Sequence, residues 1–243
     1  MSGPPAEGTA PPGAAGEEEA ARWVRGMFGR VARRYDFLNH LLSFNLDRRW
    51  RARTVRELRA ALERPGARVL DLCCGTGDLL VTRGGLGIDF CHPMLLAARG
   101  KRPGAALVEA DALALPLADR SFDVAATAFG FRNLANYEKA LREIERVLKP
   151  GGVAAILEFS QPPSALFAAL YRFYSRRILP AVGGALSGER GAYEYLPESV
   201  RKFPSADRLA DMMREAGFVE VRFERLTGGI VALHLGTTAC AAR

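Results

Sequence analysis

The residues best suited to chemistry in this sequence lie in one glycine-rich segment, Asp71-Leu72-Cys73-Cys74-Gly75-Thr76-Gly77-Asp78. Glycine has no Cβ and accepts positive φ, so Gly75 and Gly77 let a ligand approach the backbone closely. A dinucleotide-binding fingerprint requires a third glycine three positions further on, where Leu80 stands instead. The segment therefore predicts a ligand that has no pyrophosphate to be cradled.

Two further aspartates are placed to complete this site. Asp89 and Asp111 each end a short apolar segment that is expected to be a strand. The first carboxylate can accept both hydroxyls of a ribose, and the second can receive the amino group of an adenine. Because turns in any α/β protein favour Asp and Gly, a lone GxG pattern would carry little weight. Together with Asp71, the two aspartates suit an adenosine ligand that carries a cationic sulfonium.

A parallel sheet would bring these strand ends together. From residue 68 onward, short apolar segments alternate with segments of helical periodicity. The expected strands cover residues 69–72, 86–89, 106–110, 122–129 and 153–159, and the expected helices cover residues 93–100 and 137–148. This alternation predicts a mostly parallel α/β sheet that is covered on both faces. Two final strands, 218–226 and 230–235, are joined by Thr227-Gly228-Gly229 and predict an antiparallel hairpin.

The rest of the chain divides into three expected regions. Residues 1–20 are rich in Gly, Pro, Ala and Glu and are expected to be a disordered acidic segment. Residues 21–66 show helical periodicity and predict a helical N-terminal lid, which ends at Pro65-Gly66. Residues 67–243 then form the sheet domain, with a helical insertion at residues 164–216. Within that insertion, helices are expected at residues 164–179 and 205–216.

Composition and charge bound the class of protein. The 243 residues include 34 Lys and Arg against 27 Asp and Glu, a net charge of +7, and residues 21–68 alone carry +9 from thirteen Arg and four acids. No segment approaches the ~20 apolar residues of a membrane span, and the N-terminus lacks the pattern of a secretory signal, so we expect a cytoplasmic protein. The spacing of the four cysteines and three histidines predicts no metal site.

Other segments carry a more specific pattern than the glycine loop. They are Tyr35-Asp36-Phe37-Leu38-Asn39, Phe129-Gly130-Phe131-Arg132-Asn133, Tyr193-Glu194-Tyr195-Leu196-Pro197 and Thr227-Gly228-Gly229-Ile230-Val231-Ala232-Leu233-His234. With them, the chain resembles the ubiquinone/menaquinone biosynthesis C-methyltransferases over residues 23–236. The resemblance implies transfer of a methyl group from S-adenosylmethionine (SAM) to a ring carbon of a prenylated quinol. It also implies a Rossmann-like sheet preceded by a helical lid, and it favours demethylmenaquinol as the acceptor, with the benzoquinol of the ubiquinone pathway left open.

The resemblance also implies which residues bind SAM. The family contacts fall on Thr76, Asp89, Asp111 and Ala112, and a family position that is often Ser falls on Ala128, where only a backbone contact remains. They join the loop residues Asp71, Gly75 and Gly77 as expected cofactor-binding residues. Fourteen residues separate Gly75 from Asp89, which leaves room for a helix of only about two turns in the first crossover. This short crossover leaves open a catalytically impaired binding protein that has the fold of SAM-dependent methyltransferases. A methyltransferase that acts on another small molecule is the second alternative.

Methyl transfer from a sulfonium needs no nucleophilic side chain. The acceptor carbon must lie about 3–3.5 Å from the methyl group in a site that excludes water. A quinol carbon becomes nucleophilic when the neighbouring phenol, of pKa about 10, loses its proton. We expect Arg132 to lower that pKa and Asp36 to take the proton, with Tyr35, Asn39 and Asn133 as further polar candidates. An ion pair between Arg132 and Asp36 that only docks the lid is the structural alternative.

The expected partners follow from charge and from the apolar segments. The apolar segment 165–174 beside Arg176-Arg177, with the arginine-rich opening, predicts peripheral contact with the inner face of an anionic membrane; core packing and a solvated helix face are the alternatives. A nucleic-acid partner is not expected, because the fourth strand ends in Ala128-Phe129-Gly130-Phe131 rather than in the Asn/Asp-Pro-Pro-aromatic sequence of amino-group methylases. An oligomer is compatible with the sequence.

Overall fold

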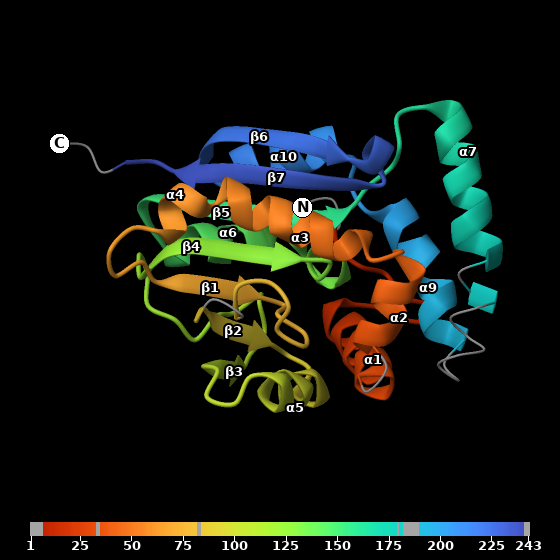
Figure 1. Ribbon diagram of the computed structural model, residues 1–243, viewed down its shortest axis with the longest axis horizontal. Coiled ribbons are helices and arrows are strands. Elements are labelled where there is room, and N and C mark those ends of the chain that lie inside the picture. The colour runs from red at the N-terminus through yellow and green to blue at the C-terminus, as the bar shows by residue number, and fades with distance from the viewer. Residues whose placement is uncertain (1–6, 33–34, 82–83, 179, 182–189, 241–243) are drawn as a thin grey trace.

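A sheet of seven strands in the order β3-β2-β1-β4-β5-β7-β6 forms the centre of the computed structural model, which describes residues 7–32, 35–81, 84–178, 180–181 and 190–240 (Figure 1). The strands are β1 (Val69–Leu72), β2 (Leu86–Asp89), β3 (Leu107–Glu109), β4 (Phe122–Ala128), β5 (Leu148–Phe159), β6 (Phe218–Leu226) and β7 (Val231–Thr238). Strands β1 to β5 are parallel, whereas β7 runs antiparallel to both β5 and β6. The expected Rossmann-like sheet with a C-terminal antiparallel hairpin is confirmed.

The middle of the sheet is covered on both faces because its strands are apolar on both. In β4, Val124 and Ala126 belong to one buried cluster and Ala125, between them, belongs to the other. Helices α3 (Leu46–Glu57) and α4 (Arg59–Leu62) cover the first face, as Figure 1 shows. Helices α6 (Tyr137–Val147) and α10 (Ala206–Glu215) cover the second.

Helix α6 shows how the sequence fixes one of these layers. The side chain of Asn136 caps the helix by accepting a hydrogen bond from the backbone N–H of Lys139. Ala140, Leu141 and Ile144 are buried at helical spacing, and burying a side chain such as Leu141 stabilises the fold by about 1.5–3 kcal/mol. The helix thereby anchors the short 3₁₀ turn η2 (Phe131–Asn133), which follows β4 at its carboxyl end.

Four helices stand beyond the carboxyl ends of the parallel strands: α1 (Glu17–Val31), α2 (Tyr35–Leu42), α7 (Ala165–Phe173) and α9 (Arg190–Lys202) (Figure 1). A π-helical turn, η3 (Tyr174–Ile178), continues α7. Helices α1 and α9 pack together, with the rings of Trp23 and Tyr195 4.9 Å apart. Helix α9 lies where the sequence predicted none. The expected N-terminal lid does not form one unit. Helices α1 and α2 lie over the strand ends, whereas α3 and α4 lie on the sheet.

The expected disorder of residues 1–20 is corrected for residues 7–20, and residues 1–6 lie outside the described part of the chain. The backbone N–H of Thr9 donates to the carbonyl of Leu134 at 2.8 Å, and the Thr9 hydroxyl lies 2.6 Å from the hydroxyl of Tyr195. Gly8 passes so close to Ala135 that an added Cβ would lie 1.9 Å from its carbonyl oxygen. Composition suggested disorder because this segment has few apolar residues, yet its backbone groups find partners on the folded domain.

The first crossover differs from the expected two-turn helix. Between β1 and β2, the described residues form turns and a single 3₁₀ position at Val81, with no α-helix. Later in the sheet, helix α5 (His92–Lys101) connects β2 to β3. None of the helices in the described ranges is long and apolar enough to cross a lipid bilayer.

Candidate functional site

The loop after β1 is held in shape by Asp71. Its carboxylate accepts hydrogen bonds from the backbone N–H groups of Leu80 and Val81, at 2.8 and 3.1 Å. Complete burial raises the pKa of Asp71 to about 7, although these two bonds favour the charged form. Gly77, with φ +81°, turns the chain here and lines none of the cavities described below. Asp71 and Gly77 therefore shape the loop.

The short crossover still brings Asp89 against the glycine loop. The carboxylate of Asp89 accepts the backbone N–H of Gly75 at 2.8 Å and that of Cys91 at 2.9 Å. Burial raises the pKa of Asp89, and the backbone hydrogen bonds offset part of that effect. At the same edge, Gly130 approaches the loop so closely that an added Cβ would lie 2.3 Å from the Cβ of Cys73. Turns alone are thus sufficient to join the loop to the second strand end.

Two small adjoining cavities follow these strand ends. One, of about 60 Å³, is lined by Gly75, Thr76, Asp89 and other residues of the loop, and by Ala128. The other, of about 20 Å³, is lined by Asp111 and Ala112 and again by Asp89. We call them together the loop cavity. Of the eight cofactor-binding residues expected from the sequence, all except Gly77 line it, namely Asp71, Gly75, Thr76, Asp89, Asp111, Ala112 and Ala128.

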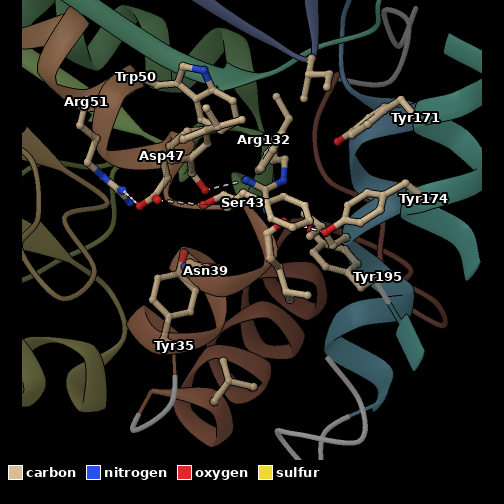
Figure 2. A pocket seen from close by; sticks show the side chains of 18 of the residues that line it. Tyr35, Asn39, Ser43, Asp47, Trp50, Arg51, Arg132, Tyr171, Tyr174 and Tyr195 are labelled. Atoms are coloured by element: carbon tan, nitrogen blue, oxygen red, sulfur yellow. Dashed lines mark hydrogen bonds and ion pairs between the residues drawn. The ribbon is translucent and has the colours of Figure 1, made fainter. Parts of the chain in front are cut away.

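A larger cavity of about 350 Å³, here called the apolar cavity, lies beneath α1, α2, α7 and α9 (Figure 2). Most of its lining is aliphatic or aromatic, and includes Met27, Val31, Leu42, Trp50, Phe159, Leu170 and Tyr171. Trp50 is fixed by a hydrogen bond from its Nε1 to the hydroxyl of Thr227, at 2.9 Å. The cavity is therefore suited to a flat apolar ring.

The two cavities share a wall. Phe28, Tyr35, Arg51 and Phe129 each line both of them. Phe129 is packed at this wall, where its ring lies 4.9 Å from that of Phe159 and 5.2 Å from the guanidinium of Arg51. Molecules in the two cavities would meet at this wall, which is the geometry that direct group transfer requires.

Arg132 reaches the apolar cavity from η2 and is almost completely buried. Its Nη1 pairs with Glu158 at 2.9 Å and donates to the carbonyl of Phe129 at 2.6 Å, while its Nε donates to Ser199 at 3.3 Å. None of these bonds uses the Nη2 atom. Burial alone would lower the pKa of Arg132, but the charge of Glu158, its hydrogen bond, and the phenols of Tyr35 and Tyr195 together outweigh burial, and the pKa is raised. A permanent positive charge therefore faces the cavity.

Two of the other polar candidates take different places. Tyr35 is in the shared wall, where burial raises the pKa of its phenol and a hydrogen bond with Asn39 opposes that effect. Asn133 lines only the loop cavity, and its amide oxygen accepts the hydroxyl of Tyr195 at 3.1 Å. The structure thus brings Tyr35, Asn39 and Arg132 together around the apolar cavity (Figure 2). It leaves Asn133 on the other side of the wall.

Asp36 pairs with Lys101 and Arg132 with Glu158, so the structural alternative of an ion pair between Asp36 and Arg132 is wrong. The Asp36 carboxylate accepts the hydroxyl of Thr76 and pairs with Lys101 Nζ at 2.7 Å. Lys101 also pairs with Asp78 at 2.6 Å, and so joins α5, α2 and the glycine loop. Asp36 lines neither cavity. Its position does not support the role of proton acceptor, because its oxygens are committed to closing the loop.

Two buried carboxylates were missed by the sequence reasoning. Glu158 interrupts the apolar β5, and a charge inside a buried strand is a signal that could have singled it out. Asp47, at the start of α3, lines the apolar cavity and is 4% exposed. Its spacing of four residues from Arg51 could have indicated an ion pair, but no pattern in the sequence places that pair at a cavity.

Comparisons with known proteins agree with this geometry. Residues 15–238 match the sequence model of the "ubiE/COQ5 methyltransferase family". The demethylmenaquinone methyltransferase of Thermus thermophilus is 51% identical, with 86% of this chain and 99% of that protein aligned. A demethylmenaquinone methyltransferase of Deinococcus radiodurans is 44% identical, over 90% of this chain and 94% of that one. A solved SAM-dependent methyltransferase of Thermotoga maritima, 22% identical, superposes with a TM-score of 0.61 over 88% of this chain and 99% of that one, and shows the same fold.

Proposed function

This chain belongs to the ubiE/COQ5 methyltransferase family, and from that premise we propose that it transfers the methyl group of SAM to a ring carbon of demethylmenaquinol. The observation that carries the proposal is the wall shared by the loop cavity and the apolar cavity. The acceptor is inferred from the names of the 51% and 44% identical relatives. The benzoquinol of the ubiquinone pathway is the second acceptor to be tested, since a 46% identical relative from Syntrophotalea carbinolica is named for both pathways.

We assign SAM to the loop cavity. SAM supplies an electrophilic methyl group on a sulfonium. The residues present fit it, because Asp89 offers a carboxylate for the ribose hydroxyls and the loop backbone at Gly75 and Thr76 has no bulky side chain in the way. Asp111 and Ala112 lie where the adenine would extend, and Ala128 contributes backbone only. The impaired-protein alternative is not favoured, because the short crossover leaves Asp89 in contact with the loop.

We assign the quinol ring to the apolar cavity, with its reacting carbon at the shared wall. Arg132 acts there on the ring hydroxyl. Its buried guanidinium lies in surroundings of low polarity, where a positive charge stabilises a phenolate far more than it would in water. The hydroxyl pKa of about 10 in water is lowered accordingly, and the ring carbon becomes the better nucleophile.

The prenyl tail needs an exit from this cavity, and α7 provides an apolar surface beside it. Leu166, Leu170 and Phe173 form one stripe of this helix, and they are 75%, 60% and 64% exposed. Leu170 also lines the cavity. Arg176 and Arg177 follow on η3, and both are exposed. We propose that this stripe rests on an anionic membrane surface, from which the tail extends into the cavity.

The function is tested with the purified protein, SAM and a short-chain demethylmenaquinol kept reduced without oxygen. We expect one methyl group on the naphthoquinol ring, detected by mass spectrometry, and slower transfer to the matching benzoquinol. Calorimetry with SAM separates the alternatives. Binding of SAM without transfer to either ring would support a methyltransferase for another small molecule. No binding at all would support the impaired protein and remove the loop-cavity assignment.

The membrane contact is tested separately by sedimentation with liposomes. Replacement of Leu166 and Phe173 by Ser should reduce binding to anionic vesicles, and neutral vesicles should bind less protein than anionic ones. Replacement of Val219, an exposed apolar residue on β6, by Ser is the matched control. Equal binding to neutral and anionic vesicles would contradict the electrostatic part.

A further inference from the structure

One carboxylate faces the apolar cavity from α3. Among the described residues that line this cavity, Asp47 alone carries an acidic side chain. One of its oxygens accepts the hydroxyl of Ser43 at 2.8 Å, and the other lies 2.8 Å from His40 Nδ1 and pairs with Arg51 (Figure 2). Burial would raise the pKa of Asp47, but Ser43 and the charges of Arg51 and His40 outweigh it and hold the pKa below its usual value. The group is therefore ionised in neutral solution.

The charged groups around the cavity form two opposed poles. Asp47 is supported on its own helix by Arg51 and from α2 by His40. Across the cavity stands Arg132, which is paired with Glu158 behind it, and Tyr35 lies in the wall between. One pole is an acceptor of hydrogen bonds and the other is a donor. A ring with two hydroxyl groups on opposite sides matches such a pair of poles.

On the proposed function, we infer that Asp47 accepts a hydrogen bond from the ring hydroxyl that does not face Arg132, and so fixes the ring in the cavity. In a 1,4-dihydroxy ring the reacting carbon lies next to only one hydroxyl, and Arg132 acts on that one. A carboxylate of low pKa leaves the second hydroxyl protonated, because it could not deprotonate a free phenol.

The reaction balances without a change at Asp47. The phenolate next to the reacting carbon becomes a carbonyl as the C–C bond forms and the C–S bond breaks. The methylated ring carbon then loses its own hydrogen as a proton to the solvent, and the electron pair of that C–H bond restores the aromatic ring. One methyl group has been gained, one proton has been released, and Asp47 remains a carboxylate. Ser43 and His40 are positioning residues, because each acts through a hydrogen bond to that carboxylate.

A second consequence is a preference for the reduced ring. A carboxylate only accepts hydrogen bonds, so it pairs with a quinol hydroxyl but faces the lone pairs of a quinone carbonyl. Hydrogen bonds to charged groups contribute enough for a preference of at least tenfold in affinity. An asparagine at the same position can donate to a carbonyl, so Asp47→Asn should remove or reverse this preference.

The experiment compares wild type, Asp47→Asn, Asp47→Glu and Glu57→Gln. Glu57 is the matched control because it lies at the other end of α3 and is also paired with arginines, Arg53 and Arg222, away from the cavity. Affinity is measured without oxygen for 1,4-naphthohydroquinone and 1,4-naphthoquinone, and methylation of the hydroquinone is followed in the same samples. We expect Asp47→Asn to lose the redox preference and to bind the hydroquinone at least tenfold more weakly, with the affinity partly restored in Asp47→Glu.

Two results would overturn the inference. One is Asp47→Asn protein that binds the hydroquinone as tightly as wild type does. The other is wild type that binds both redox forms equally well, a result that does not depend on whether the variants fold. Wild type that prefers the hydroquinone but transfers no methyl group would overturn the proposed function instead, while supporting the recognition of the hydroxyl by Asp47.

Discussion

Replacement of Arg132 by Met separates the two roles that this side chain can have. The guanidinium pairs with Glu158, whose side chain is 1% exposed and cannot reach water. Removing one partner of such a buried pair costs about 3–5 kcal/mol, because the other charge is left uncompensated. In a chain of this size, 1 kcal/mol corresponds to about 2–4 °C, so the Tm should fall by roughly 6–20 °C. A change this large is measurable by thermal unfolding at several pH values.

A second substitution then restores stability without restoring the charge. Glu158→Gln removes the buried carboxylate and keeps an oxygen that can accept the backbone N–H of Phe159, which now bonds Glu158 at 2.8 Å. We expect the double variant to recover about half of the lost stability or more. If Arg132 stabilises the phenolate, kcat of the double variant should still be about a hundredfold lower than that of wild type.

The pH dependence of the methyl-transfer rate tests the catalytic role of Arg132. Without Arg132 the quinol hydroxyl keeps a pKa of about 10, so the rate of methyl transfer should rise with pH until the phenol ionises by itself. Wild type should reach its plateau at lower pH. Arg146→Met is the control, because Arg146 is paired with Glu143 and Asp119 on the surface away from both cavities. A double variant that regains stability and also turns over like wild type would show that Arg132 only fastens η2 to the sheet.

Three further outcomes are expected. Asp36→Asn should raise the KM for SAM, with little effect on the affinity for the acceptor, because Asp36 and Lys101 close the glycine loop. The measurement is steady-state kinetics with each substrate varied in turn, and a change in the acceptor KM alone would contradict the prediction. Because burial raises the pKa of Asp71 to about 7, its contribution to stability is complete below about pH 4 and is lost progressively as the pH rises to about 7. Asp71→Asn should therefore gain Tm over wild type increasingly between about pH 4 and pH 7, and an equal gain at pH 4 would refute the assigned cause. Gly130→Ala should lower both Tm and SAM affinity, because its Cβ would lie 2.3 Å from the Cβ of Cys73. A Tm and a SAM affinity that calorimetry finds unchanged would mean that the loop moves freely at this point.

The glycine loop and its strands could be predicted from the sequence because their causes are local. Apolar runs alternating with helical periodicity fix the elements, and Gly75 and Gly77 mark a turn that no other residue type makes as easily. The side chains of Asp89 and Asp111 then follow, since parallel strands end at the same edge of the sheet. Seven of the eight expected cofactor-binding residues accordingly line the two adjoining cavities that make up the loop cavity.

The partners of the charged residues could not be predicted in the same way. Asp36 and Arg132 both belong to specific sequence motifs, yet Asp36 is held by Lys101 and Arg132 by Glu158. Residue type shows that a charge needs a partner when it is buried, but the identity of that partner depends on which elements meet. The partner of Arg132 lies 26 residues away on a strand, and the partner of Asp36 lies 65 residues away on another helix.

The sequence by itself determined the fold, the family and the edge of the sheet where the donor is expected, because periodicity, glycine positions and motifs act over short distances. Only the tertiary structure decided that residues 7–20 are packed, that α3 lies on the sheet, and that its Asp47 faces Arg132 across a cavity. That decision depends on packing between segments far apart in the chain. No local sequence pattern predicts this arrangement, because the same aspartate on another face of the helix would form only an ordinary ion pair with its arginine.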